Sequence, residues 1–419
     1  MKKRKLWLKL TSLLLLCAII TGLGGCAMPV KAKNLMDGIS PASVTALEDL
    51  SEGSAAVTDF ALRLFKAANE EGENALISPL SVLCALAMTA NGADGDTLSQ
   101  MEEALGMDRD SLNLYLYSYI NSLAEGDKYK LKLANSIWFR DDERFTVKED
   151  FLQTNADYYG ADIYKSAFDR QTLSDINNWI KRETDGMIPR VLDSIPEEAI
   201  TYLINTVAFE AEWMNVYEKH QVRDGQFTRE DGVKQSVKMM YDTEGKYLED
   251  EHATGFIKYY SGRKYAFAAL LPKEDVSVSD YLSSLDGESL SSLLKNAESR
   301  TVKTAIPKFE VEYETEMSEA LSLMGMVDAF DVKSADFNGI GSWSEGNIFI
   351  SNVIHKTYIQ VGEKGTRAGA VTVIEMDGAA SADPTEIKEV YLDRPFVYLL
   401  IDCENNIPFF IGTLMDAGS

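Results

Sequence analysis

Short apolar runs that suit buried strands recur along the chain, and they constrain its fold more than any other feature. The clearest are Phe267-Ala-Ala-Leu-Leu, Asn347-Ile-Phe-Ile-Ser and Pro395-Phe-Val-Tyr-Leu-Leu-Ile. Helical patterns alternate with them: Phe60, Leu64 and Ala68 recur at helical spacing, and so do apolar residues within 174–182. No linker rich in Gly, Ser or Pro and no repeat of fixed period interrupts this alternation. We therefore predict one large α+β domain.

The chain is strongly acidic. Of its 419 residues, 41 are Lys or Arg and 66 are Asp or Glu, so the formal net charge is −25 at pH 7. Such a protein lacks the basic surface that binds nucleic acid or an anionic polysaccharide. Its 45% of hydrophobic residues is ordinary for a globular protein. We predict a folded protein that does not bind nucleic acid.

Residues 1–25 have the pattern of an export signal. Basic residues at positions 2–5 and 9 precede an apolar stretch, and small residues follow it. The run Leu23-Gly-Gly-Cys26 resembles the bacterial lipobox, in which cleavage before the cysteine leaves a thiol that is lipidated. We therefore expect Cys26 to anchor the protein to the outer face of a bacterial cell membrane, with residues 26–52 as a flexible tether. An ordinary secretory signal, which would release the protein, and an uncleaved anchor are the alternatives.

Two cysteines remain in the chain if that cleavage occurs. Cys84 and Cys403 both lie among apolar residues. Such surroundings favour buried, free thiols, while a disulfide between the two is the alternative that sequence does not decide. No framework of several disulfides is expected to support the fold.

The motifs of common enzyme sites are missing from the sequence. The three histidines are His220, His252 and His355, and there is no HExxH, paired CxxC, GxSxG, phosphate-binding loop or dinucleotide-binding glycine motif. Acidic pairs such as Asp94 and Asp96 are not spaced like calcium ligands. We therefore expect no metal and no cofactor, and a binding or interaction protein rather than an enzyme.

The segment 365–377 alternates in a way that suits a strand. Its even positions, from Thr366 to Met376, are all uncharged, whereas charged residues such as Arg367 and Glu375 are at odd positions. One face is therefore able to enter a core. An ordinary half-buried strand fits this pattern as well as a strand that inserts into a sheet. A loop of small residues follows, as an insertable strand would require.

This segment resembles the hinge of the serpin family. The family pattern Glu-x-Gly-Thr-x-Ala-x-Ala-x-Thr is matched by Glu363, Gly365, Thr366, Ala368, Ala370 and Thr372. Other family-like stretches follow the family's order: NALISPLSVLCALAMTANGA at 74–93, LANSIWF at 133–139, INNWI at 176–180, NTVAF at 205–209, IPKF at 306–309 and FFIG at 409–412. The resemblance covers about 57–415. It implies a serpin domain over 53–419, with a central β-sheet, additional sheets, surrounding helices and an exposed reactive-centre loop at about 363–385.

The resemblance implies a suicide inhibitor of serine proteases. In that mechanism a protease attacks the exposed loop as a substrate, and the cleaved loop inserts into the central sheet before the acyl-enzyme is hydrolysed. Ser78, Ser81, Asn205 and His355 match the family's shutter, where strands part, and Trp213 matches the breach, where insertion starts. Each of them fits equally well as a satisfied polar group or packed aromatic of the core. The alternative function is a non-inhibitory, serpin-fold binding or chaperone-like lipoprotein.

Counted from Glu363 as in the family, the resemblance implies a scissile bond between Ala379 and Ala380, with Ser381 and Ala382 as alternates. These residues are small and neutral, which suits the shallow pocket of an elastase-like or subtilisin-like protease and disfavours a trypsin-like enzyme. The stretch 101–132 lacks the basic cluster of heparin-activated serpins, so we expect no activation by heparin. We also expect a monomer.

Overall fold

The computed structural model describes residues 30–123, 126–188, 190–196, 199–344, 346–366 and 387–418. The expected export signal lies outside these residues, and so do several of the site predictions. Those predictions concern Cys26, Ala368, Ala370, Thr372, Ala379, Ala380, Ser381 and Ala382. The first part of the hinge, from Glu363 to Thr366, lies within the described chain.

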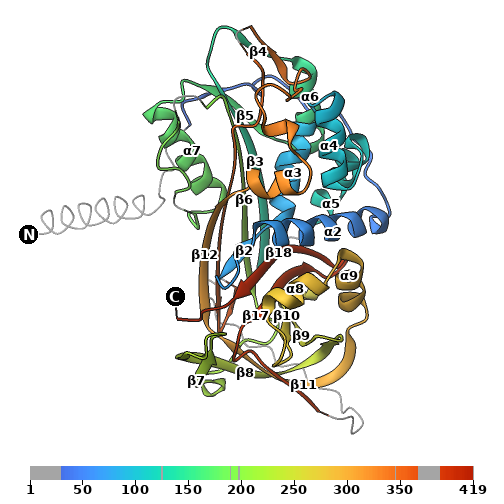
Figure 1. Ribbon diagram of the computed structural model, residues 1–419, viewed down its shortest axis with the longest axis vertical. Coiled ribbons are helices and arrows are strands. Elements are labelled where there is room, and N and C mark those ends of the chain that lie inside the picture. The colour runs from blue at the N-terminus through green and yellow to red at the C-terminus, as the bar shows by residue number, and fades with distance from the viewer. Residues whose placement is uncertain are drawn as a thin grey trace, which may run out of the picture.

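The helices gather on two sides of a long sheet, with α7 on one side and α3 to α6 on the other (Figure 1). In the described residues the helices are α2 (Ser51–Ala68), α3 (Pro79–Ala90), α4 (Gly95–Leu105), α5 (Arg109–Ser122), α6 (Glu149–Tyr159), α7 (Arg170–Glu183), α8 (Val278–Ser284), α9 (Gly287–Lys295) and α10 (Ser318–Leu323). The first packed helix expected from the sequence is confirmed as α2, which buries Phe60 and Leu64 completely. The helix expected over 174–182 is confirmed within α7. None of the described helices is long and apolar enough to cross a membrane.

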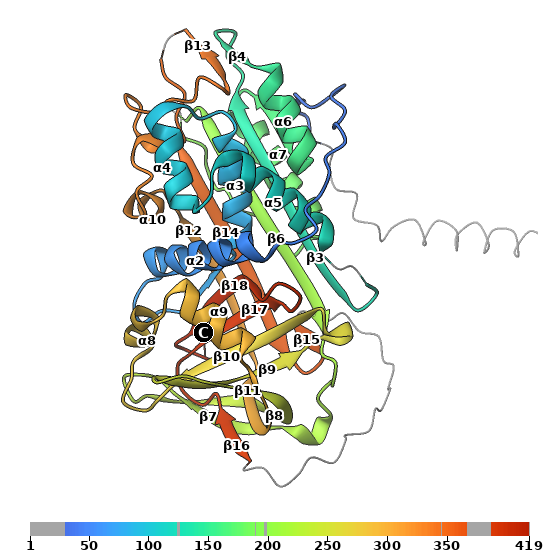
Figure 2. The same ribbon diagram turned by 90° about the vertical axis from the view of Figure 1, so that its right-hand side faces the viewer.

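The long sheet positions the candidate site. Its described strands run in the order β1 (Lys33–Asn34), β5 (Asp162–Ser166), β3 (Tyr129–Arg140), β6 (Thr201–Glu212), β15 (Gly365–Thr366), β14 (Asn352–Gly362) and β12 (Phe309–Glu316). β6 bonds to β3 and β14 bonds to β12 in antiparallel ladders. β6 and β14 also pair directly with each other over a few residues, in parallel. β15 lies between these two strands and near the second sheet (Figure 2).

Residues of β3 alternate between two cores on opposite faces of the long sheet. Ile137 and Phe139 belong to the main hydrophobic core, whereas Trp138 belongs to a second cluster. The alternation arises because successive side chains of a strand point to opposite faces. α7 completes the second cluster with Ile176 and Trp179, which are three residues apart and share one helical face. Burial of each such large apolar side chain stabilises the fold by about 1.5–3 kcal/mol.

The second sheet holds the most completely buried strands. Its described order is β16 (Lys388–Tyr391), β11 (Glu298–Pro307), β8 (Lys234–Glu249), β9 (Ala253–Tyr259), β10 (Tyr265–Pro272), β17 (Phe396–Asp402), β18 (Ile407–Leu414) and β2 (Ala75–Ile77), with β7 (Val222–Thr228) beside β8. The buried strands expected over 267–271 and 395–401 are confirmed as β10 and β17, in which every residue is buried. A small separate sheet pairs β4 (Phe145–Val147) with β13 (Gly341–Trp343).

The prediction of a strand over 347–351 is wrong. These residues form no strand, and β14 begins only at Asn352. Ile348 and Ile350 are buried as expected, but the Ile350 N–H donates to the Ala329 carbonyl, outside any sheet. The apolar run predicted burial correctly. It did not predict the ladder, because a short buried run is the same pattern whether or not a neighbouring strand is beside it.

The segment before α2 differs from the free tether that we expected. β1 pairs with β5, and the Leu35 N–H donates to the Ile163 carbonyl at 2.7 Å. Asp175 of α7 accepts hydrogen bonds from the backbone N–H groups of Lys31 and Ala32, at 3.0 and 2.9 Å. A segment without periodicity is ordered here because side chains and strand edges elsewhere in the chain satisfy its backbone. The described part of the segment therefore docks on the domain.

The two cysteines of the domain are free thiols. Cys84 is fully buried in α3 and Cys403 is partly buried. Burial raises the pKa of each thiol to about 12. Both are therefore protonated and poorly nucleophilic at neutral pH.

Candidate functional site

The strand β15 continues from β14 through a tight hairpin whose turn consists of Glu363 and Lys364. After the turn, Thr366 pairs with Val361 of β14 on one side and with Ala211 of β6 on the other. Both pairings are antiparallel. Thr366 is only 1% exposed, as a strand with its even positions inward requires. The first two residues of the hinge strand are therefore already part of the long sheet.

Gly365 occupies a position that only glycine fits. Its φ is +150°, a backbone conformation that other residues rarely adopt. A Cβ atom added there would lie 2.0 Å from the carbonyl oxygen of Ala211 on β6. The missing side chain is what lets the hairpin approach β6 closely enough to pair with it.

The segment that follows β6 holds the hairpin turn through three hydrogen bonds. The backbone N–H of Trp213 donates to the Lys364 carbonyl at 2.8 Å, and the indole Nε1–H donates to the Gly362 carbonyl at 2.8 Å. The backbone N–H of Tyr217 donates to the Glu363 carbonyl at 3.0 Å. These bonds fix the turn to the end of β6, and two of them come from Trp213, the residue predicted at the breach.

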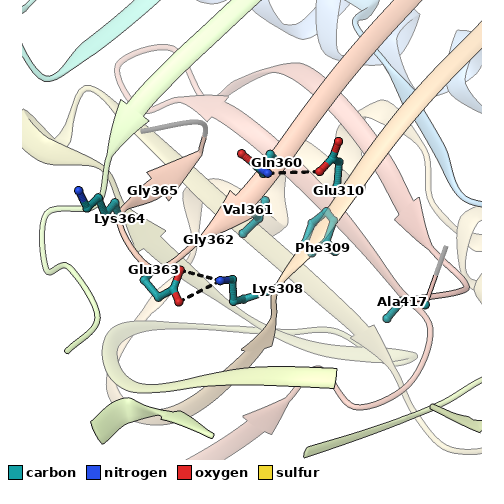
Figure 3. Close-up of a pocket in the computed structure, with 11 residues that line it drawn as sticks. Lys308, Phe309, Glu310, Gln360, Val361, Gly362, Glu363, Lys364, Gly365 and Ala417 are labelled. Atoms are coloured by element: carbon teal, nitrogen blue, oxygen red, sulfur yellow. Dashed lines mark hydrogen bonds and ion pairs between the residues drawn. The ribbon is translucent and has the colours of Figure 1, made fainter. Parts of the chain in front are cut away.

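An open pocket of about 570 Å³ lies beside this turn, lined by the ends of β12 and β14 and by Ala417. Figure 3 shows its lining residues. Lys308 Nζ lies 2.9 Å from the Glu363 carboxylate. Although partial burial opposes the effect, this ion pair lowers the pKa of Glu363. Both side chains are more than a third exposed, so the pair contributes at most about 1 kcal/mol. In the described part of the chain, no cluster of His, Cys, Asp or Glu is arranged to hold a metal ion.

A buried aromatic stack lies against the hinge. The rings of Trp213 and Tyr260 are parallel within 6°, with their centroids 4.4 Å apart. Lys258 Nζ lies 5.5 Å from the Trp213 ring and bonds to Asp242 at 2.8 Å and to Glu244 at 2.7 Å. Burial pushes the pKa of Lys258 down, but its anionic neighbours raise it overall. Sequence reasoning missed Tyr260 and Lys258, since neither lies in a motif and only the fold brings them to the hinge.

The residues predicted as the shutter meet where β6 and β14 pair directly. His355 of β14 lies opposite Asn205 of β6 in this parallel ladder. His355 Nε2 accepts a hydrogen bond at 3.0 Å from the backbone N–H of Ser78, the residue that precedes α3. Ser81, in the first turn of α3, is as completely buried as Ser78. Burial lowers the pKa of His355 to about 3, so the imidazole is neutral and its Nε2 is free of the proton that would prevent it from accepting.

The predicted site residues thus fall into two groups on one sheet. Along β6, Asn205 and Ala211 are six positions apart, which corresponds to about 20 Å. The group at the direct pairing contains Ser78, His355 and the backbone of Asn205, with Ser81 three residues after Ser78 in the first turn of α3. The group at the hairpin contains Glu363, Gly365, Thr366 and Trp213. The functional roles of these residues, and the rest of the hinge, stay predictions.

β6 and β14 are thus paired directly at one place and separated at another by the chain's own hairpin. A family model described as Serpin (serine protease inhibitor) matches residues 55–417. The chain belongs to the serpin family. Serpins are generally inhibitors of proteases rather than enzymes.

Solved structures and curated proteins agree with this assignment. The native state of tengpin, a thermophilic serpin, is 47% identical and has a TM-score of 0.88, covering 92% of this chain and 100% of that one. Tengpin in its latent state is 44% identical with a TM-score of 0.78, covering 89% of this chain and 99% of that one. An uncharacterized serpin-like protein of Thermococcus kodakarensis is 27% identical over 97% of this chain and 98% of its own length. The described fold is thus more similar to the native tengpin structure than to the latent one.

Proposed function

We propose that the protein is a suicide inhibitor of elastase-like or subtilisin-like serine proteases. The observation that carries this proposal is β15, which is paired on both sides within the long sheet. The expected scissile bond follows it in the sequence. The protease serine would attack the carbonyl of Ala379 or of a close neighbour, and the amine of the next residue would leave. The segment after Thr366 would then extend β15 between β6 and β14 before water cleaves the acyl-enzyme.

β6 has a backbone edge with which such a strand could pair. From Thr206 to Glu210, β6 pairs with β3 on one side, but in the described residues it has no ladder partner on the side of β14. Loop insertion in serpins is a known case of strand addition to a sheet. Each added backbone hydrogen bond contributes about 1 kcal/mol net, so a full strand would contribute on the order of 10 kcal/mol. This amount is comparable with the stability of a whole domain.

The proposal is tested by mixing the protein with a pancreatic-type elastase or with subtilisin. We expect a covalent complex that survives SDS, and a loop cleaved at the residues named above by mass. Thr366→Arg would put a charge at a fully buried position, which should block insertion and turn the inhibitor into a substrate. Lys364→Arg, on the exposed turn two residues earlier, is the matched control and should inhibit normally.

Cleavage of the loop without any complex would contradict the inhibitory function and would favour the non-inhibitory binding protein. In that case cleavage should also leave the melting temperature unchanged, whereas insertion of the loop should raise it.

We also propose that the protein is exported and anchored by a lipid on Cys26 to the outer face of a bacterial membrane. The support is the basic and apolar pattern of residues 1–25 followed by the lipobox-like run. Cys26→Ala should release the protein from the membrane fraction or stop its processing. An unmodified cysteine in the mass of the mature chain would contradict the anchor and favour secretion.

A further inference from the structure

The side chain of Tyr260 ends at the hinge. Its hydroxyl oxygen lies 2.5 Å from Thr366 Oγ1, and both residues are buried. These residues are 106 positions apart in the chain: Tyr260 directly follows β9 of the second sheet, and Thr366 belongs to β15 of the long sheet. The contact is a hydrogen bond in which either hydroxyl donates. It joins the residue that follows β9 to the first inward-facing residue of the hinge strand.

The Tyr260 ring is held firmly in the orientation that this bond needs. Trp213 stacks on one face of it, and Phe209 of β6 meets it edge to face with centroids 5.2 Å apart. The Tyr260 backbone N–H donates to the Tyr265 carbonyl at 3.0 Å, and Tyr260 also forms a β-bridge with Trp213. Because these contacts fix the ring, its hydroxyl oxygen stays beside Thr366 Oγ1.

Burial raises the pKa of the Tyr260 phenol well above its usual value, so the group is a neutral hydroxyl at any ordinary pH. A neutral hydroxyl in a buried site needs a hydrogen-bond partner, and leaving it without one costs about as much as a lost hydrogen bond. Thr366 supplies this partner in the observed register.

The register of the hinge decides which side chain meets Tyr260. A slip of one residue along the ladder would bring Gly365 or Arg367 to the place of Thr366, because a strand presents alternate residues to each face. Glycine has no hydroxyl, and arginine would put a charge into a site that is 1% exposed. The slip to Gly365 would also leave the buried Tyr260 hydroxyl without a hydrogen-bond partner.

We propose that Tyr260 is a positioning residue that fixes the register in which the hinge strand enters the long sheet. This inference rests on the proposed function for its effect on inhibition, but not for its effect on the hinge itself. With Thr366 held in place, insertion would continue from a strand already started, and the chain would not have to search for the register during the lifetime of the acyl-enzyme.

The test compares Tyr260→Phe and Thr366→Val with the parent protein. Each change removes one hydroxyl and keeps the ring or the branched shape. We expect the amide hydrogens of a peptide covering 360–366 to exchange about 5- to 30-fold faster in both variants. The double variant should exchange no faster than either single one, since the same bond is already lost. Tyr398→Phe is the control, because the buried Tyr398 hydroxyl has no hydrogen-bond partner among the described residues.

Inhibition gives the second measurement. With elastase or subtilisin, both variants should acylate the protease at the parent's rate. Several-fold more inhibitor should be consumed per protease trapped, because slower insertion favours hydrolysis of the acyl-enzyme. A general loss of stability would instead lower the melting temperature of the variant relative to the parent. Unchanged exchange over 360–366 in both variants would overturn the proposal, and faster exchange with unchanged partitioning would overturn its role in insertion. If the parent forms no complex with either protease, the proposed function fails while the exchange measurement still decides whether Tyr260 holds the hinge.

Discussion

At one end of the long sheet β15 separates β6 from β14, whereas about 20 Å away the same two strands bond directly to each other. The rings of Trp213 and Tyr260 lie beside the separated end. Gly365 approaches β6 closely there because it has no side chain. The direct pairing is covered by the start of α3, where buried polar groups bond across from helix to strand. The two ends of one pair of strands therefore have different chemistry.

The difference between the two ends bears on where a strand could be added between β6 and β14. At the hairpin, an added strand meets aromatic rings and a stretch of β6 backbone that has no ladder partner on the side of β14 in the described residues, so its own backbone groups can pair there. At the direct pairing, a passing strand would have to break the parallel ladder and disturb the contact between Ser78 and His355. Each buried polar group left unpaired costs about 1–3 kcal/mol. We expect the first end to set the start of insertion and the second to set its barrier.

The largest effect on inhibition is expected for Gly365→Ala at the hairpin. The added Cβ would clash with the Ala211 carbonyl and would sit at a φ that alanine rarely adopts. Expulsion of β15 should raise the stoichiometry of inhibition about tenfold or more, since a penalty of about 1.4 kcal/mol already equals a factor of ten. The control is Gly362→Ala across the same turn, where an added Cβ meets nothing within 4 Å. Equal behaviour of the two variants would mean that the close approach to β6 is unimportant.

His355→Ala tests the other end of the comparison. It removes the acceptor for the Ser78 N–H and leaves a cavity in a fully buried site, so we expect a loss of about 2–5 kcal/mol and a melting temperature lower by several degrees. Scanning calorimetry measures this change. His220→Ala, whose side chain is 77% exposed, should leave the melting temperature where it is. A normal melting temperature in the His355 variant would show that the direct pairing needs no support from α3.

The same histidine predicts a dependence on pH. Its pKa is about 3 in the folded protein, below the value of about 6.5 expected when unfolded. Below pH 6.5 the unfolded chain therefore binds a proton that the folded protein excludes, and stability falls as the pH drops toward 3, by up to about 1.4 kcal/mol per unit. Above pH 6.5 this contribution is constant. His355→Gln should flatten the slope of melting temperature between pH 7 and 5 relative to the parent, while His220→Gln should keep it.

The smallest effect is expected for Glu363→Gln, which removes the charge that faces Lys308 beside the turn. Since both side chains are more than a third exposed, we expect a change of less than about 1 kcal/mol that disappears in high salt. Glu404→Gln is the control, because it breaks an exposed ion pair with Lys264 elsewhere in the protein. It should change the free energy of unfolding by a similarly small amount. A large and salt-independent effect at Glu363 alone would mean that the turn depends on this ion pair, and not on the bonds from Trp213 and Tyr217.

The inward face of the hairpin strand β15 was more predictable from sequence than the side-chain contacts that hold this strand. The alternation after Gly365 predicted an inward Thr366, and the buried position of Thr366 agrees with this. The sequence around Tyr260 did not predict its contact with the hinge, because its partner Thr366 is 106 residues away. The docking of Lys31 and Ala32 on Asp175 was missed for the same reason, since it joins residues more than 140 positions apart.

The sequence by itself determined the α+β class, the buried strands β10 and β17, and the family, because these depend on local periodicity and on motifs that stay in order along the chain. Only the tertiary structure decided where a buried run becomes a strand, as the failure over 347–351 demonstrates. It alone also decided that the hairpin enters between β6 and β14 and which rings surround it. Local patterns fix which face of an element is apolar, whereas the partner of that face is chosen by packing between distant parts of the chain.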